Sequence, residues 1–259
     1  MKSQVSPIRW AHTSAGDAVH ITHATRAALM TDVADRFAAH EGFTLATLNL
    51  DHIVKMRRDP AFLEAYQAHS HVVADGNPIV WLSGLAGRQV DLVPGSELIA
   101  PLAAVAARMD VPVAFLGSTQ ETLDTAAARL VADHPGLRVV ARIAPAFGLD
   151  VTGPDADALI ARLDDSGARL CLLALGAPKQ EIFAMRAAAR LPECGFASIG
   201  AGLDFIAGHQ TRAPRLVRRF ALEWAWRMAT NPRRLAGRYA ACAAILPRLA
   251  REARQQRGV

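Results

Sequence analysis

The chain has 259 residues, of which 51% are apolar, and it carries a formal net charge of +5. This length and apolar share suffice for one large α/β domain with a buried core, which excludes extensive disorder. No apolar stretch reaches the ~18–20 residues that a membrane-spanning helix needs, and residues 1–16 are too mixed in character for a signal peptide.

Short apolar runs recur along the chain and read as strands. They are predicted, in chain order, at residues 43–48, 71–74, 111–116, 137–143, 170–175 and 195–199. Helices are predicted between them, at residues 22–40, 60–68, from 77, 97–108, from 119, 155–163 and after Pro178. Helix ends are expected from Gly42 as a C-terminal stop, Asp59 and Ser96 as N-caps, and Ser118 with Glu121 as a capping box. Strands that alternate with helices predict a Rossmann-like α/β fold, a parallel sheet with helices on both faces.

The strand pattern stops at Arg212, and the rest of the chain is rich in arginine. Residues 212–259 carry twelve arginines against two acidic residues, whereas residues 1–211 carry 17 basic and 22 acidic residues. We therefore predict a Rossmann-like domain over residues 1–211 and a basic helical appendage over residues 212–259. Helix starts or breaks are expected at Pro214, Pro232 and Pro247.

The composition of the appendage predicts its partner. Trp224 and Trp226 lie among the arginines, a combination typical of a helix on an anionic membrane surface. A solvated charged face with packed tryptophans is the second interpretation. Nucleic acid is the third, and because the body is acidic no nucleic-acid partner is expected.

Polar residues follow four of the predicted strands at the point where each strand ends. They are Thr47 and Asn49, Asp75, Ser118, and Lys179 with Gln180. Because the carboxyl ends of parallel strands meet at one edge, these side chains are expected to lie along the same edge of the sheet. Asp75 is the best general-base candidate there. The alternative is that it caps the following helix, since Asp is a common N-cap.

Three glycine-containing turns at the same predicted edge are candidate ligand sites. Residues 170–181 read as a strand, a turn at Gly176 and the polar start of a helix. Such a unit can bind an anion at the helix N-terminus. Its alternative is a turn with a solvated Lys179 and Glu181. Gly117 with Ser118 can hold a phosphate through backbone N–H groups. Gly200 and Gly202 allow a close backbone approach to a ligand, or form only a tight turn.

Several enzyme classes lack their signatures in this chain. There is no G-x-G-x-x-G or Walker A loop, no G-x-S-x-G elbow and no D-x-D pair. The three cysteines (Cys171, Cys194 and Cys242) have neither disulfide nor metal-ligand spacing, which fits a reducing cytoplasm. His69 and His71 are interpreted as residues of a helix–strand junction, and no metal site is predicted.

A series of motifs resembles, in the same order, the WecG/TagA/CpsF glycosyltransferases (glycosyltransferase family 26). The resemblance covers residues 20–245 and rests on Thr47-Leu48-Asn49, Asp75-Gly76, Pro94-Gly95-Ser96-Glu97-Leu98, Phe115-Leu116-Gly117, Gly176-Ala177-Pro178-Lys179-Gln180-Glu181, Gly200-Ala201-Gly202-Leu203-Asp204-Phe205, Arg212-Ala213-Pro214, Leu222-Glu223-Trp224 and Asn231-Pro232-Arg233-Arg234.

The resemblance implies an inverting transfer of a sugar from a UDP-sugar to a saccharide on a polyprenyl diphosphate, during cell-surface polysaccharide synthesis. The enzyme is expected to be peripheral on the cytoplasmic face of the membrane, to need no metal and to use no cofactor. Asp75 matches the proposed base, while Thr47, Asn49 and Gln180 match pocket residues. Without a metal, arginines are expected to meet the phosphate charge. The candidates are Arg212, Arg227, Arg233 and Arg234.

One position departs from the family pattern. Many members have an arginine three residues before the glycine matched by Gly95, and this chain has Leu92 there. Arg88 is expected one helical turn away as a substitute. Because leucine cannot bind an anion, Leu92 supports an alternative hypothesis. In it, the protein is a relative of the enzyme that binds a nucleotide-sugar or a lipid without catalysing transfer. A homo-oligomer is a further expectation, since a tail that leaves the body exposes apolar surface that a second copy can cover.

Overall fold

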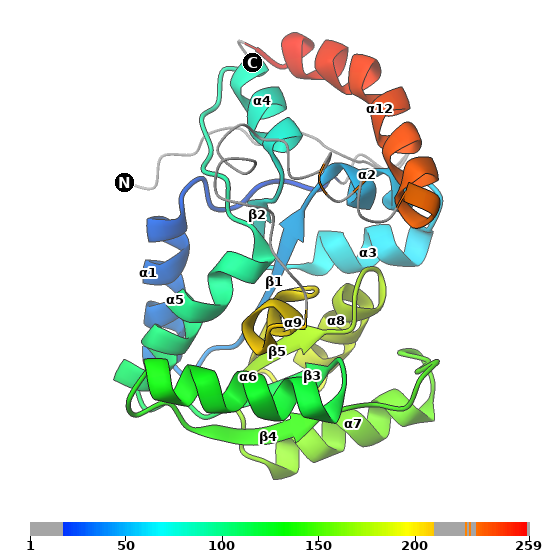
Figure 1. Ribbon diagram of the computed structural model, residues 1–259. Helices are drawn as coiled ribbons and strands as arrows, with labels where there is room; N and C mark the ends of the chain where they lie inside the picture. The colour runs from blue at the N-terminus through cyan, green and yellow to red at the C-terminus, as the bar shows by residue number, and fades with distance from the viewer. Residues whose placement is uncertain (1–17, 210–225, 227, 229–231, 258–259) are drawn as a thin grey trace.

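The computed structural model describes residues 18–209, 226, 228 and 232–257. Its centre is a six-stranded parallel sheet with the order β2-β1-β6-β5-β3-β4 (Figure 1). The strands are β1 (Phe43–Leu48), β2 (His71–Ala74), β3 (Val113–Gly117), β4 (Val139–Ile143), β5 (Leu170–Ala174) and β6 (Gly195–Ser198). Every predicted strand is present. The apolar runs of the central strands suit strands that are buried on both faces, whereas β4, at the edge of the sheet, alternates between half-buried and exposed residues.

Helices surround this sheet. They are α1 (Arg26–Ala38), α2 (Leu50–Met56), α3 (Pro60–Ala68), α4 (Asn77–Leu85), α5 (Gly95–Arg108), α6 (Gln120–Asp133), α7 (Pro154–Asp165), α8 (Lys179–Arg190), α9 (Gly202–Ala207) and α12 (Pro232–Gln255). The short helices α2 and α9 were not expected from the sequence. Helix α2 follows β1 without a loop because the side chain of Asn49 accepts the backbone N–H of His52 and caps it.

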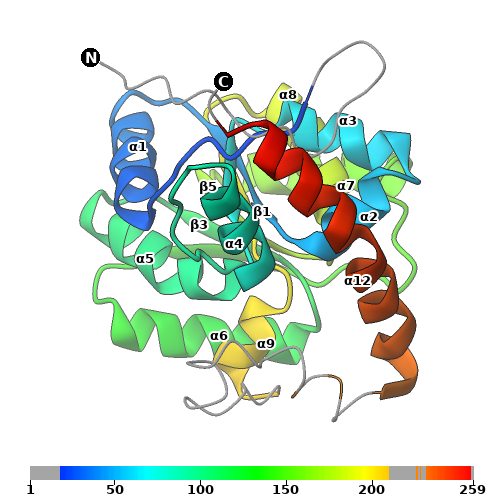
Figure 2. The same cartoon turned by 90° about the horizontal axis from the view of Figure 1, so that it is seen from above.

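Two apolar layers cover the two faces of the sheet. Helices α1, α5, α6 and α9 pack on one face through buried residues such as Leu29, Leu102 and Leu123. Helices α7 and α8 pack on the other face through residues such as Leu159 and Phe183. Figure 2 shows the sheet between these groups. The Rossmann-like α/β prediction with helices on both faces is confirmed.

Several predicted helix ends were wrong. Helix α1 ends at Ala38. The residue that takes the left-handed conformation after it is His40, with φ 58°, and not Gly42, which was predicted to end the helix. Helix α5 begins at Gly95, directly after Pro94, so Ser96 lies inside the helix and not at its N-cap. The side chain of Thr119 caps α6 by accepting the N–H of Thr122 at 3.2 Å, in place of the predicted Ser118–Glu121 box. Several neighbouring residues can cap or end a helix at such positions, and tertiary contacts determine which of them does so.

The C-terminal helix α12 is present and packs against α2 and α4 (Figures 1 and 2). Its buried stripe consists of Leu235, Cys242, Leu249 and Ala253, and the last three join an apolar cluster with residues of α2 and α4. Pro232 begins this helix as predicted, whereas Pro247 lies inside it and does not break it. No helix of the described residues is long and apolar enough to cross a membrane. The proposed domain boundary at residue 212 lies outside the described residues.

Candidate active site

Asp75 and Asn49 lie side by side at the carboxyl edge of the sheet. Strands β1 and β2 are parallel neighbours that end at Leu48 and Ala74, so the next residue of each strand lies at the same edge. The backbone N–H of Asp75 donates to the carbonyl of Leu48 at 2.7 Å. The amide Nδ2 of Asn49 lies 3.5 Å from the Oδ2 of Asp75. The expectation that these polar residues converge at one edge is therefore met for this pair.

Asp75 does not cap the following helix. The N-cap of α4 is Gly76, whose φ of 94° turns the chain sharply, and no side chain makes a capping hydrogen bond there. The helix-cap interpretation of Asp75 is thus wrong. The half-buried carboxylate of Asp75 instead lies beside an amide, at the edge of the sheet where parallel α/β folds bind ligands.

Thr47 belongs to a buried layer beneath this edge. Its side chain is only 5% exposed, and its Oγ1 would lie 3.3 Å from a Cβ added at Gly95, so it packs against the start of α5. Its carbonyl accepts the hydroxyl of Tyr66 at 3.1 Å, and that hydroxyl also contacts the Nδ1 of His52 at 2.6 Å. Since the tyrosine proton goes to Thr47, the imidazole donates to the tyrosine oxygen. Both aromatic side chains are buried and hold α2 and α3 on β1.

Gln180 and Glu181 form a second buried layer at the start of α8. The Oε1 of Gln180 accepts the backbone N–H of Gly200 at 3.2 Å, and its Nε2 donates to the Oε1 of Glu181 at 2.8 Å. Both polar ends of Gln180 are therefore held by the protein, and its side chain is 3% exposed. Gln180 therefore joins the start of α8 to the turn after β6. The turn between β5 and α8 is contacted by Lys55 of α2, which donates to the carbonyl of Ala177.

Glu181 is a buried carboxyl group that the sequence did not single out as important. Its side chain is fully buried, and its Oε2 has no hydrogen-bond partner among the described residues. Burial raises the pKa of Glu181 to about 7, although the hydrogen bond from Gln180 works in the opposite direction. Burial also raises the pKa of Tyr66, with Glu181 and Asp75 adding to the effect. A titratable group therefore lies under the candidate site.

The glycines of the three candidate turns have different surroundings. At Gly117 a Cβ would overlap the backbone of Ala174, so this glycine is required by the close approach of β5. At Gly202 a Cβ would overlap the side chain of Ile99 and lie 3.2 Å from the Cα of Ser96, because α9 packs closely on α5. At Gly176 and Gly200 a Cβ would meet no atom of the described residues within 4 Å. These two positions therefore have room beside the Cα for a ligand.

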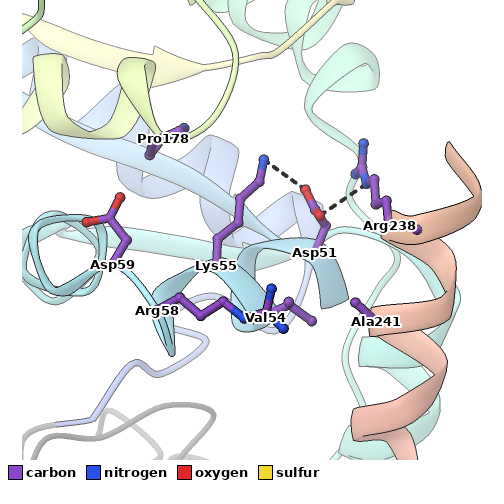
Figure 3. A pocket seen from close by; sticks show the side chains of 9 residues that line it. Asp51, Val54, Lys55, Arg58, Asp59, Pro178, Arg238 and Ala241 are labelled. Atoms are coloured by element: carbon purple, nitrogen blue, oxygen red, sulfur yellow. Dashed lines mark ion pairs between the residues drawn. The ribbon is translucent and has the colours of Figure 1, made fainter. Parts of the chain in front are cut away.

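A cavity of about 430 Å³ lies between α2, α12 and the start of α8. Figure 3 shows Asp51 between Lys55 and Arg238, with ion pairs of 3.0 Å and 3.3 Å to them. Arg58 adds a third cation to the lining, and Asp59 a second carboxylate. Asp51 and Lys55 lie one turn apart on α2, and Arg58 follows the end of this helix, but this cationic lining went unrecognised in the sequence because α2 itself was not predicted.

Four arginines were predicted to bind phosphate. Arg212 and Arg227 lie outside the described residues, and so do the side-chain contacts of Arg234, which is part of α12. Arg233 is exposed near the beginning of α12. The same helix contributes Arg238 to the cavity, one turn further along.

Together these features give the carboxyl edge two chemical capacities. A carboxylate beside an amide can accept a proton from a bound hydroxyl group. A neighbouring cavity with three cations and two carboxylates can hold an anion such as a diphosphate. No group among the described residues at this edge has the spacing of a metal site; the one cluster that does lies elsewhere in the fold.

The sequence model described as the Glycosyl transferase WecG/TagA/CpsF family matches residues 17–258. The match includes the whole sheet, both layers beneath the carboxyl edge and helix α12. It covers nearly the entire chain, so it concerns the protein as a whole and not a single motif.

Proposed function

Because the chain belongs to the WecG/TagA/CpsF family of glycosyltransferases, we propose that it transfers a sugar from a UDP-sugar to a saccharide linked to a polyprenyl diphosphate. The family places the protein among the transferases of cell-surface polysaccharide synthesis. The observation that carries the proposal is the position of Asp75, a half-buried carboxylate beside Asn49 at the carboxyl edge, free of the helix-capping role.

In the proposed reaction Asp75 takes the proton of the acceptor hydroxyl. The oxygen of that hydroxyl forms a bond to the anomeric carbon as the bond from this carbon to the β-phosphate oxygen breaks, and UDP leaves with the electron pair. Attack from the face opposite the leaving group inverts the anomeric centre. Asn49 holds the carboxylate in place through its amide, 3.5 Å away.

Cationic side chains are proposed to meet the phosphate charge. Lys55 and Arg238 share the single carboxylate of Asp51, so the cavity retains positive charge that Asp51 does not balance. A diphosphate can replace part of that pairing, because guanidinium and ammonium groups bind phosphate oxygens strongly. Arg212, Arg227, Arg233 and Arg234 remain proposed partners of the donor or acceptor phosphates. In this arrangement the charge on the leaving UDP is met by side chains of the protein and no metal is needed.

The exposed arginines of α12 support the proposal that the protein associates with the inner face of the membrane, where a lipid-linked acceptor is found. Arg233, Arg251 and Arg254 lie on the solvent side of this helix, away from its buried stripe. Anionic headgroups attract such residues by about 1 kcal/mol each.

The proposal is tested with Asp75→Asn, which keeps the shape of the side chain and removes the base. We expect UDP release in the presence of lipid-linked acceptor to fall by about 100- to 10,000-fold. The matched control is Asp133→Asn at the exposed end of α6, which should keep full activity.

An Asp75→Asn enzyme with activity within tenfold of the wild type would show that Asp75 is not the base. Wild-type protein that binds UDP-sugars but releases no UDP with any lipid-linked acceptor would favour the non-catalytic relative instead. The assay thus separates a wrong base from a wrong function.

A further inference from the structure

A cluster of two histidines and an aspartate lies at the amino-terminal edge of the sheet, opposite the candidate active site. His71 is the first residue of β2, Asp32 lies on α1, and His23 precedes α1. The Nε2 of His71 is 2.6 Å from the Oδ2 of Asp32, and the Nε2 of His23 is 4.0 Å from the same oxygen. The three ligand atoms all lie within 4.8 Å of one another.

The geometry of the cluster is close to that of a metal site. The two imidazole rings are stacked, with centroids 4.7 Å apart and an interplanar angle of 6°. Ligand atoms of a tetrahedral zinc ion are about 3.3 Å apart, given zinc–ligand bonds of ~2.0–2.1 Å. The contact distances of 2.6 Å and 4.0 Å to Asp32 bracket this value, and no pair of the three atoms is more than 4.8 Å apart, so side-chain rotations would bring them to bonding positions.

Hydrogen bonds behind His71 orient its ring. The Oγ of Ser70 accepts the N–H of Thr44 at 3.0 Å and donates to the carbonyl of Thr44 at 3.2 Å. The same Oγ lies 2.8 Å from the Nδ1 of His71 and can accept its proton. In that tautomer the Nε2 of His71 has a lone pair for a metal. In the other tautomer Nε2 donates to the Oδ2 of Asp32, 2.6 Å away, so a bound metal would replace this hydrogen bond.

A guanidinium group contacts the same carboxylate oxygen of the cluster. The Nε of Arg36 lies 3.0 Å from the Oδ2 of Asp32 and competes with a metal for that oxygen.

We propose that His23, Asp32 and His71 bind one zinc ion, with water at the fourth position. Imidazole nitrogens with a carboxylate are the ligands that zinc accepts readily, and the hydrogen bond from His71 to Ser70 is the outer-shell contact that such ligands usually have. The ion joins the segment before α1, α1 itself and β2. It is a structural site, separate from the transferase reaction at the other edge of the sheet.

The test uses full-length, untagged protein that has been freed of metal with a chelator and is titrated with zinc chloride at pH 7.5. Calorimetry should show one zinc per chain, and the Tm should rise with zinc. His23→Ala and Asp32→Asn should each lower the affinity at least about tenfold, while circular dichroism confirms that both variants fold. His23 is chosen over His71 because His71 is buried in the sheet.

Two further variants sharpen the test. His40→Ala removes an exposed histidine just after α1 and should leave zinc affinity unchanged. Arg36→Gln removes the competing guanidinium and should raise the affinity several-fold, a gain that adventitious surface binding would not show. Cobalt in place of zinc should give visible absorption bands that the His23→Ala variant lacks.

The proposal is overturned if calorimetry shows no zinc binding. It is also overturned if His23→Ala and Asp32→Asn bind zinc as tightly as the wild type does. A protein that binds no zinc, but whose stability depends on pH through Asp32 and His71, would show that a proton fills the cluster. None of these results depends on transferase activity, so the zinc site and the proposed function can fail independently.

Discussion

Glu181 is fully buried at the start of α8, and burial raises its pKa to about 7 from an ordinary value of 4.5. The folded protein therefore holds this proton more tightly than the unfolded chain does. The stability that this proton contributes is fully present below about pH 4.5 and is lost as the pH rises to about 7. Glu181 also holds the amide of Gln180, which in turn holds Gly200.

At the residue scale, Glu181→Gln should flatten this pH dependence. The variant keeps an oxygen for Gln180 and carries no charge at any pH. Relative to the variant, the wild type should lose about 3 kcal/mol at most in free energy of unfolding between pH 4.5 and 7. Urea denaturation at several pH values measures the difference. Glu64→Gln, an exposed change on α3, is the control, and parallel profiles for wild type and Glu181→Gln would contradict the prediction.

At the scale of elements, the packing of α9 against α5 sets the position of the turn after β6. A Cβ at Gly202 would overlap the side chain of Ile99 and approach the backbone of Ser96 at 3.2 Å. Flexible side-chain atoms can move away, but backbone atoms of a helix cannot do so without a shift of the helix. Gly202 is therefore explained by helix packing, before any contact with substrate is considered.

Gly202→Ala should lower the free energy of unfolding by about 1–3 kcal/mol because of this crowding. The matched control is Gly237→Ala on α12, where an added Cβ meets no atom of the described residues within 4 Å. That change should stabilise the protein by up to about 1 kcal/mol, since alanine favours helices over glycine. Chemical denaturation of both variants tests the pair. Equal effects of the two substitutions would rule out the packing explanation.

At the scale of the whole molecule, the distribution of charge separates an acidic body from a basic C-terminal helix. Helix α12 packs against α2 and α4 through its buried stripe, and its exposed face carries arginines. Removing the helix would take Leu249, which is 3% exposed, out of the core and uncover the apolar residues of α2 and α4 beneath it, so a truncated protein would lose both charge and core. Charge neutralisation on the intact helix is the cleaner experiment.

Arg251→Gln with Arg254→Gln should lower the affinity for anionic liposomes, measured by sedimentation, by about 30-fold, since each arginine contributes about 1 kcal/mol at such a surface. The control neutralises two exposed arginines of the body, Arg108 and Arg162, and removes the same net charge. The loss should shrink with added salt. Equal losses for both pairs would mean that net charge, and not α12, controls the association.

Several features of this protein followed from the sequence alone. Apolar runs located all six strands, because the strands inside the sheet are buried on both faces and only the edge strand β4 alternates with exposed residues. The parallel arrangement then placed Asn49 and Asp75 at one edge without any knowledge of their distance. The motifs that resemble the family also belong to the sequence, and the match to residues 17–258 agrees with them.

Only the tertiary structure decided which polar groups meet. Asp32 and His71 are 39 positions apart, and Gln180 reaches Gly200 across a complete helix and strand. Lys55 and Arg238 come together because α12 folds back onto α2. Periodicity reports the environment of a residue over a few neighbours along the chain, whereas these contacts depend on the packing of distant elements. The sequence therefore determined the fold and the candidate base, and the packing determined the buried network, the cationic cavity and the histidine cluster.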